Sequence, residues 1–196
     1  MEFKTKKLML TDMLSLEDYD NQREQIKSQI IDNKKRRTVK IGENVVLLFE
    51  NYETIKYQVQ EMLRIEKIFQ KESIQEEIDA YNPLIPDGKN LKATMLIMYP
   101  NVEERRIMLN KLHDIENKVW ISVKDSKFFG IADEDLDRAT ENKTSAVHFL
   151  RFELNKKTIE EFQLSNEIKF GVDHQNYTHQ TIISSEIKES LQKDFW

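Results

Sequence analysis

Apolar residues recur along the chain at two spacings, which separate predicted helices from predicted strands. Between residues 52 and 69 they fall three or four positions apart, as on one face of an α-helix. Between residues 144 and 154 they alternate with other residues, which is typical of a β-strand with one face in the core. One face of this strand carries Ala146, His148, Leu150, Phe152 and Leu154, and the other carries Ser145, Val147, Phe149, Arg151 and Glu153.

The same patterns, with turn and capping residues, predict the rest of the secondary structure. Ser15 with Asp18, and Ser73 with Glu76, have the spacing of a helix N-cap and its partner. Further helices are predicted over residues 11–37, 73–81, 102–116, 133–140, 156–163 and 186–195. Further strands are predicted over residues 38–41, 45–50, 91–99, 119–123, 128–131, 168–173 and 177–183. The strand over residues 91–99 is apolar enough to predict burial on both of its faces.

The order of these elements predicts the fold class. Strands come in neighbouring pairs and do not alternate strictly with helices, which favours an α+β fold with mostly antiparallel sheet packed against several helices. A chain of 196 residues without an internal repeat fits a single domain over residues 1–196, with a helical N-terminal segment at about residues 11–37 and no separate module.

Composition excludes several kinds of site. The chain has no cysteine, which rules out disulfides, a cysteine nucleophile and any thiolate-ligated cluster. Its four glycines are isolated, and none forms a phosphate-binding loop or a nucleophile elbow. Charged residues make up 33% of the chain and the net charge is −5, so general attraction to nucleic acid is not expected. No apolar run reaches the length of a membrane span, and we expect a cytoplasmic protein.

Histidines near the C-terminus are the sharpest candidates for chemistry. His174 and His179 bracket four residues; if these four form a hairpin loop, the two histidines stand opposite each other with Cβ atoms roughly 5 Å apart. His148 on the neighbouring strand would complete an open three-histidine site for a divalent metal, as in a metal-dependent enzyme. The alternative is that His148 is a hydrogen-bonded core residue and the other two are exposed at a loop.

Two charged segments have simpler interpretations. Residues Lys34 to Arg37 form a basic run that could contact phosphates, but no aromatic residues interleave with it, and a solvated helix end explains it better. Asp133, Asp135, Asp137 and Glu141 have the spacing of calcium-loop ligands. Arg138 and Thr144 stand where that loop needs a glycine and a bidentate glutamate, so an acidic helix start is favoured.

Two other features remain without a role. Residues Asn82 to Asn90 contain two prolines and an Asp-Gly pair, which predict a loop pinned to the core. A polar cluster combines Tyr57, Gln60, Glu61 and Arg64 with Arg151 and Glu153. The helical members fit a solvated face, whereas apolar neighbours suggest that Arg151 and Glu153 form a partly buried pair of structural importance.

Several strings together resemble an uncharacterised bacterial family catalogued as domain of unknown function 3501. They are Tyr57–Glu66, Ala80–Gly88, Lys143–Leu154 and Asp173-His174 with Tyr177 and His179. The resemblance covers nearly the whole chain and implies a redox or oxidative-stress context, with rubrerythrin-like or iron–sulfur oxidoreductase proteins as partners. The chain is then an accessory or binding protein. A metal-dependent enzyme using His148, His174 and His179 and a nucleic-acid-binding protein using Lys34 to Arg37 are the alternatives, and a homo-oligomer is left open.

Overall fold

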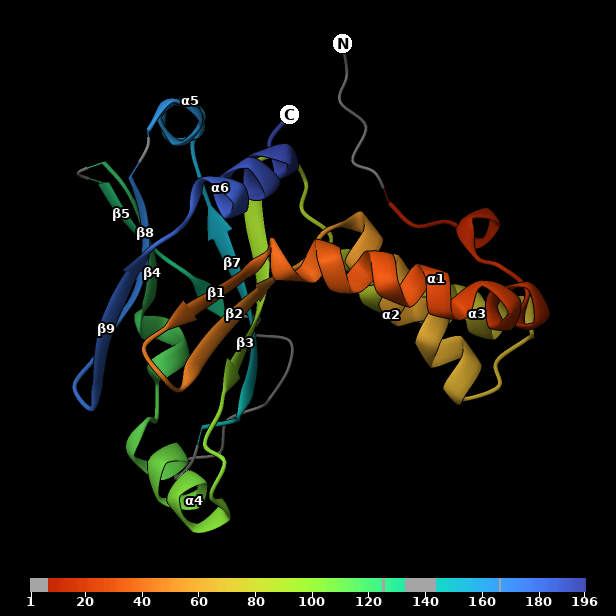
Figure 1. Ribbon diagram of the computed structural model, residues 1–196, viewed down its shortest axis with the longest axis horizontal. Helices are drawn as coiled ribbons and strands as arrows, with labels where there is room; N and C mark the ends of the chain where they lie inside the picture. Colours follow the sequence, from red (N-terminus) through yellow and green to blue (C-terminus); the bar gives the residue numbers. More distant parts are fainter. Residues whose placement is uncertain (1–6, 125, 133–143, 166) are drawn as a thin grey trace.

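Two antiparallel sheets form the body of the protein in the computed structural model, which describes residues 7–124, 126–132, 144–165 and 167–196 (Figure 1). The first sheet has the strand order β1-β2-β3-β7-β6 and the second the order β5-β4-β8-β9. The strands of the first sheet are β1 (Thr38–Ile41), β2 (Val45–Phe49), β3 (Asn90–Ile97), β7 (Val147–Glu153) and β6 (Ile131–Ala132). Those of the second are β5 (Ser126–Phe129), β4 (Val119–Val123), β8 (Ile168–His174) and β9 (Tyr177–Ile182).

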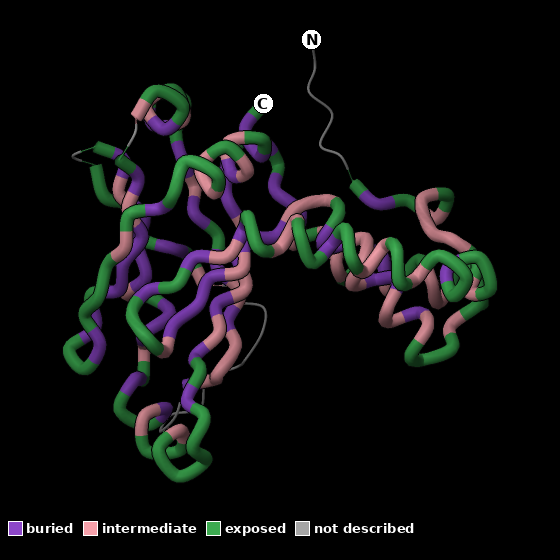
Figure 2. Tube along the Cα trace, in the orientation of Figure 1, coloured by how far each residue is buried: buried purple, intermediate pink, exposed green. Residues whose placement is uncertain are grey.

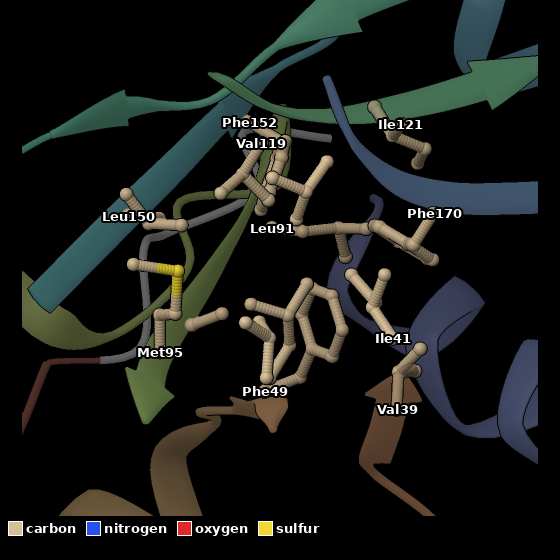
Figure 3. Packing of buried hydrophobic residues seen from close by; sticks show 14 of the residues in the cluster. Val39, Ile41, Phe49, Leu91, Met95, Val119, Ile121, Leu150, Phe152 and Phe170 are labelled. Atoms are coloured by element: carbon tan, nitrogen blue, oxygen red, sulfur yellow. The ribbon is translucent and has the colours of Figure 1, made fainter. Parts of the chain in front are cut away.

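The two sheets pack face to face around one apolar core (Figure 3). Every second residue of the central strands points into it, as the alternating sequence predicts for half-buried strands. Phe170 of β8 lies between Phe49 of β2 and Phe152 of β7, with ring centroids 5.0 and 5.7 Å away. These aromatic contacts join the sheets across the interface, leaving the opposite face of the first sheet outside this core.

Three helices project from the sheets as an arm: α1 (Leu16–Lys35), α2 (Tyr52–Ile65) and α3 (Lys71–Tyr81) (Figure 1). The arm has its own apolar core, and buried segments of the trace run along it (Figure 2). Ser15 caps α1 by accepting a hydrogen bond from the Asp18 amide at 3.1 Å, as predicted, and Asn51 caps α2 through the Thr54 amide at 2.9 Å. The buried residues of this core are Leu8, Ile55, Val59, Leu63, Ile78 and Ile85.

The remaining helices are α4 (Val102–Lys111), α5 (Lys156–Leu164) and α6 (Ser185–Leu191). Short 3-10 turns lie at Leu10–Asp12, Asn82–Leu84, Ile115–Lys118 and Gln192–Asp194. The last turn is tied to β2 by Arg37, whose guanidinium is 1% exposed and is paired with the carboxylate of Asp194. Arg37 also donates to the carbonyls of Phe49 and Glu50, at 3.0 and 2.9 Å.

The α+β class is confirmed, and several boundaries differ from the prediction. Helix α2 ends at Ile65 rather than at Phe69, and α3 begins at Lys71 rather than at Ser73. The helix predicted over residues 102–116 stops at Lys111 and resumes as a 3-10 turn. The predicted acidic helix over residues 133–140, with its calcium-like spacing, lies outside the described residues. None of the described helices is long and apolar enough to cross a membrane.

A further difference concerns the strand over residues 91–99. The prediction that both faces of the strand at residues 91–99 are buried is wrong. Leu91, Ala93, Met95 and Ile97 are buried in the sandwich core, whereas Lys92, Thr94 and Leu96 are partly exposed on the outer face of the first sheet. The loop predicted at residues 82–90 lies beside this face.

Candidate functional site

A groove of about 490 Å³ opens on the outer face of the first sheet. Its floor comes from β3, β7 and β6, and one wall comes from the loop at residues 82–90. This volume lies within the usual range of small-molecule sites. Apolar groups, including Leu84, Ile131 and Phe149, line the groove. Its charged lining residues are Asp87 on the loop and Glu50, Lys92 and Arg151 at the floor.

The strand register places the three charged residues of the floor in one row across the sheet. Lys92 and Arg151 are direct partners between the antiparallel strands β3 and β7. On the other side, the Glu50 amide donates to the Lys92 carbonyl at 2.8 Å, so Glu50 continues the row beyond the end of β2. Directly opposed residues on one face have Cβ atoms roughly 5 Å apart, so the row brings one carboxylate and two cationic side chains to a single strip of the groove.

Glu50 is the buried member of this row. It is 5% exposed, directly follows the end of β2 and lines the groove. The carboxylate accepts hydrogen bonds from Thr54 Oγ1 at 2.6 Å, Thr94 Oγ1 at 2.8 Å and Gln58 Nε2 at 3.0 Å. All three donors are uncharged. Within the described residues, the hydrogen-bond partners of the Glu50 carboxylate are thus neutral side chains from α2 and β3, and the nearest cation in the row is Lys92.

The two cations are less buried than Glu50. Arg151 Nη1 donates to Glu153 Oε1 at 2.6 Å, and Asn90 Nδ2 donates to the same oxygen at 3.0 Å. Arg151 and Glu153 do form a pair, and their side chains are only partly buried, at 46% and 40% exposed. Both project from the outer face of β7, which no second sheet covers. Lys92 Nζ donates to the Pro83 carbonyl and so links the floor of the groove to its loop wall.

The loop wall is anchored at both of its ends. Asn82 exchanges two hydrogen bonds with the Leu8 backbone, at 2.8 and 3.1 Å. At the other end Gly88 forms a parallel bridge with Phe195 and lies against the Trp196 ring. Gly88 has φ +94°, and a Cβ there would lie 2.9 Å from the indole, so both the backbone and the packing require glycine. The anchored loop that the prolines predict thus forms one wall of the groove.

The structure does not bring the three candidate histidines into one site. The turn between β8 and β9 has two residues, so His174 pairs with Tyr177 and His179 pairs with Val172. The prediction that His174 and His179 face each other is therefore wrong. In the described ranges, no three side chains of histidine, aspartate or glutamate converge as they would around a metal ion. Metal binding by these residues stays a prediction.

Each histidine has other contacts. His148 is buried, with Nε2 2.8 Å from Thr144 Oγ1 and 3.8 Å from the Glu116 carboxylate. His174 is also buried; its Nδ1 accepts from the Asn176 amide at 3.2 Å, which leaves Nε2–H to donate to the His113 carbonyl at 3.0 Å. The exposed ring of His179 lies 4.6 Å from that of Tyr177. Both buried histidines thus have the hydrogen-bonded environments of core residues.

The basic run is only partly a solvated helix end. Arg37 is buried, contrary to that interpretation, because it bonds to Asp194 and to three backbone carbonyls. Lys34 Nζ lies 5.7 Å from the centre of the Tyr57 ring, and Lys35 pairs with Asp32 at 3.1 Å. A smaller cavity of about 180 Å³ lies beside this segment.

The helical part of the predicted polar cluster is separate from the groove. Glu61 of α2 accepts bonds from Tyr19 at 2.5 Å and from Arg23 at 2.7 Å, both on α1. The bond from Arg23 lowers the pKa of Glu61 to about 2, against the opposing effect of burial. Gln60 bonds to the backbone of Leu14 at 3.0 and 3.2 Å. These contacts hold α1 on α2 and are structural.

Sequence reasoning found Arg151 and the loop but missed Glu50 and Lys92 as site residues. A signal was present in the strand over residues 91–99, where Lys92 and Thr94 alternate with apolar residues. That alternation marks an outer face in contact with water. Glu50 left a weaker signal, since it follows an apolar strand directly and gives no indication of which face it occupies.

A family model matches nearly the whole chain, including the residues that line the groove. The model of the protein family of unknown function DUF3501 matches residues 7–195. The chain belongs to this family. A crystal structure described as a novel protein of unknown function from Burkholderia pseudomallei is 44% identical, with a TM-score of 0.91; the alignment covers 97% of this chain and 100% of that one. A search of curated proteins gives no match. Both the family and the crystal structure are described as of unknown function.

Proposed function

We propose that this protein is a binding protein that holds a small polar molecule in the groove between the outer face of the first sheet and the loop at residues 82–90. The observation that carries the proposal is the row of Glu50, Lys92 and Arg151 across the floor. Concave sites that bind small molecules combine apolar walls with a few polar groups that fix orientation, and this groove has both.

The construction of the wall also supports binding. The loop is held by Asn82 at one end and by Gly88 at the other, so the groove is formed in advance and little chain has to be ordered when a ligand enters. Lys92 joins floor and wall through the Pro83 carbonyl. A structural surface does not need this combination of an anchored loop and opposed cations.

A small-molecule screen tests the proposal. Compounds that raise the melting temperature of the wild-type protein are titrated by calorimetry against Arg151→Met and against Lys157→Met. Lys157 is an exposed cation on α5 outside the groove lining, so its variant has the same charge change away from the site. We expect at least tenfold weaker binding to Arg151→Met and unchanged binding to Lys157→Met. Compounds that bind all three proteins equally would show that the groove is not the site.

The family resemblance adds a proposal about context: the protein works as an accessory to a redox system, through contact with a rubrerythrin-like or iron–sulfur oxidoreductase protein. The absence of cysteine fits a component that carries no thiolate-ligated cluster of its own. Affinity purification of tagged protein from its native host tests this idea. Absence of any enriched redox protein, with and without crosslinking, would count against it.

A further inference from the structure

We infer that the ligand of the groove is an amino acid with an apolar side chain, bound through its ammonium and carboxylate groups; this inference rests on the proposed binding function. The groove offers three different surfaces for such a molecule. They are the carboxylate of Glu50, the cationic pair of Lys92 and Arg151, and an apolar wall that includes Leu84, Ile131 and Phe149.

Glu50 selects for a cationic donor. Its two carboxylate oxygens provide about four acceptor positions. Three are used, one on Oε1 by Thr94 and two on Oε2 by Thr54 and Gln58. One position on Oε1 is therefore left for a donor. Since the three present donors are neutral, an incoming ammonium group would also supply the positive charge that this buried carboxylate lacks among its hydrogen-bond partners.

Lys92 and Arg151 select for an anion. They are direct cross-strand partners, so both cationic side chains leave the same strip of the groove floor. Arg151 is balanced on one side by Glu153, to which it is bonded through Nη1, so Nη2 and Nε do not take part in that bond. A planar carboxylate is the group that a guanidinium binds best, through two parallel hydrogen bonds. An anion bound here would face the free side of this guanidinium and the neighbouring ammonium group of Lys92.

The spacing of these groups fits a small zwitterion. Neighbouring strands lie roughly 4.8 Å apart, so the Glu50 and Lys92 backbones are separated by about one strand spacing and Arg151 by about two. Flexible side chains from these positions can converge on adjacent ammonium and carboxylate groups. The apolar residues beside them leave a place for a hydrocarbon side chain, and about 490 Å³ is ample for an amino acid of any size.

Matched ligands measure the contributions of the ammonium group and of the carboxylate to binding separately. Calorimetric titrations at low salt use L-leucine and L-phenylalanine. Isoamylamine and phenethylamine are the same molecules without the carboxylate; 4-methylpentanoate and 3-phenylpropionate are the same molecules without the ammonium group. Glycine lacks the apolar side chain. We expect the wild-type protein to bind leucine or phenylalanine at least tenfold more tightly than glycine and than both of the matching analogues.

Two variants then test which residue of the groove recognises each charged group of the ligand. In Glu50→Gln the preference for leucine over 4-methylpentanoate should disappear, and in Arg151→Met the preference for leucine over isoamylamine should disappear. Lys157→Met should retain both preferences. Arg151 is half exposed, so its variant keeps the test decisive even if Glu50→Gln fails to fold, which circular dichroism would show.

Equal binding of an amino acid and its analogues, or no binding of either amino acid at millimolar concentration, overturns the inference. The proposed function survives that result if another compound from the screen binds in an Arg151-dependent manner. If no compound does so, the proposed function fails as well.

Discussion

Replacement of Glu61 by glutamine should remove a pH-dependent part of the stability of the helical arm. Glu61 accepts two hydrogen bonds from Arg23, at 2.7 and 3.0 Å, and one from Tyr19 at 2.5 Å. The bonds from Arg23 are the largest cause of the lowered pKa of Glu61, and burial opposes them. The carboxylate therefore stabilises the contact between α1 and α2 in its charged form.

The size of the effect follows from the pKa. The shift from 4.5 to about 2 corresponds to roughly 3 kcal/mol at neutral pH, at about 1.36 kcal/mol for each unit. Water reaches 17% of the Glu61 side chain and 24% of that of Arg23, so screening reduces the expected value to about 1–2 kcal/mol. Because the folded pKa lies below the unfolded one, this contribution is complete above about pH 5 and is lost as the pH falls toward about 2.

Urea denaturation followed by circular dichroism at about pH 7, 5 and 3 measures the difference in unfolding free energy between wild type and Glu61→Gln. The difference should be nearly constant between about pH 7 and 5 and should fall by roughly 60% by about pH 3. Glu66→Gln is the control, since Glu66 is exposed and lies on the same segment beyond the end of α2. A difference that is flat from about pH 5 to 3 would refute the assignment of the shift to this ion pair.

Two further substitutions test contacts of the C-terminal residues, one with Gly88 in the groove wall and one with Arg37. Gly88→Ala should lower the unfolding free energy by about 1–3 kcal/mol, because Gly88 has φ +94° and the new Cβ would meet the Trp196 ring at 2.9 Å; unchanged thermal stability and tryptophan fluorescence would contradict the packing described. Arg37→Met should cost about 3–5 kcal/mol, because it leaves Asp194 buried without its cation. Burial raises the pKa of Asp194 to about 6, so its charged form destabilises the fold as the pH rises through that value. The loss in Arg37→Met should therefore be smaller at about pH 5 than at about pH 8, and Asp194→Asn in the same chain should recover part of it; equal losses at both pH values would rule this out.

Local patterns were sufficient to predict the fold class and most elements. The alternation in residues 144–154 correctly placed His148, Leu150 and Phe152 on the buried face of β7, because a half-buried strand imposes that pattern on its sequence. Turn length was not predictable for the hairpin of β8 and β9. Both a two-residue and a four-residue loop suit Gln175 to Thr178, and the shorter turn moves His179 opposite Val172. The change of register separated the two histidines and removed the geometry on which the three-histidine prediction depended.

The groove was beyond prediction for a different physical reason. Its charged row joins Glu50, Lys92 and Arg151, which are far apart in the sequence and come together only through the pairing of three strands. Nothing local distinguishes Lys92 from a solvated lysine or Arg151 from a partner of Glu153. The distinction comes from the neighbours: two cations are opposed on one face, and the carboxylate next to them is buried among neutral donors. A buried carboxylate bonded to neutral donors costs stability in the protein alone, and the ammonium group of a bound zwitterion would offset that cost. The groove variants therefore carry a stability test as well as a binding test. Glu50→Gln should fold at least as stably as the wild type in the absence of ligand, and a loss of several kcal/mol would mean that the carboxylate is there to hold α2 on the sheet.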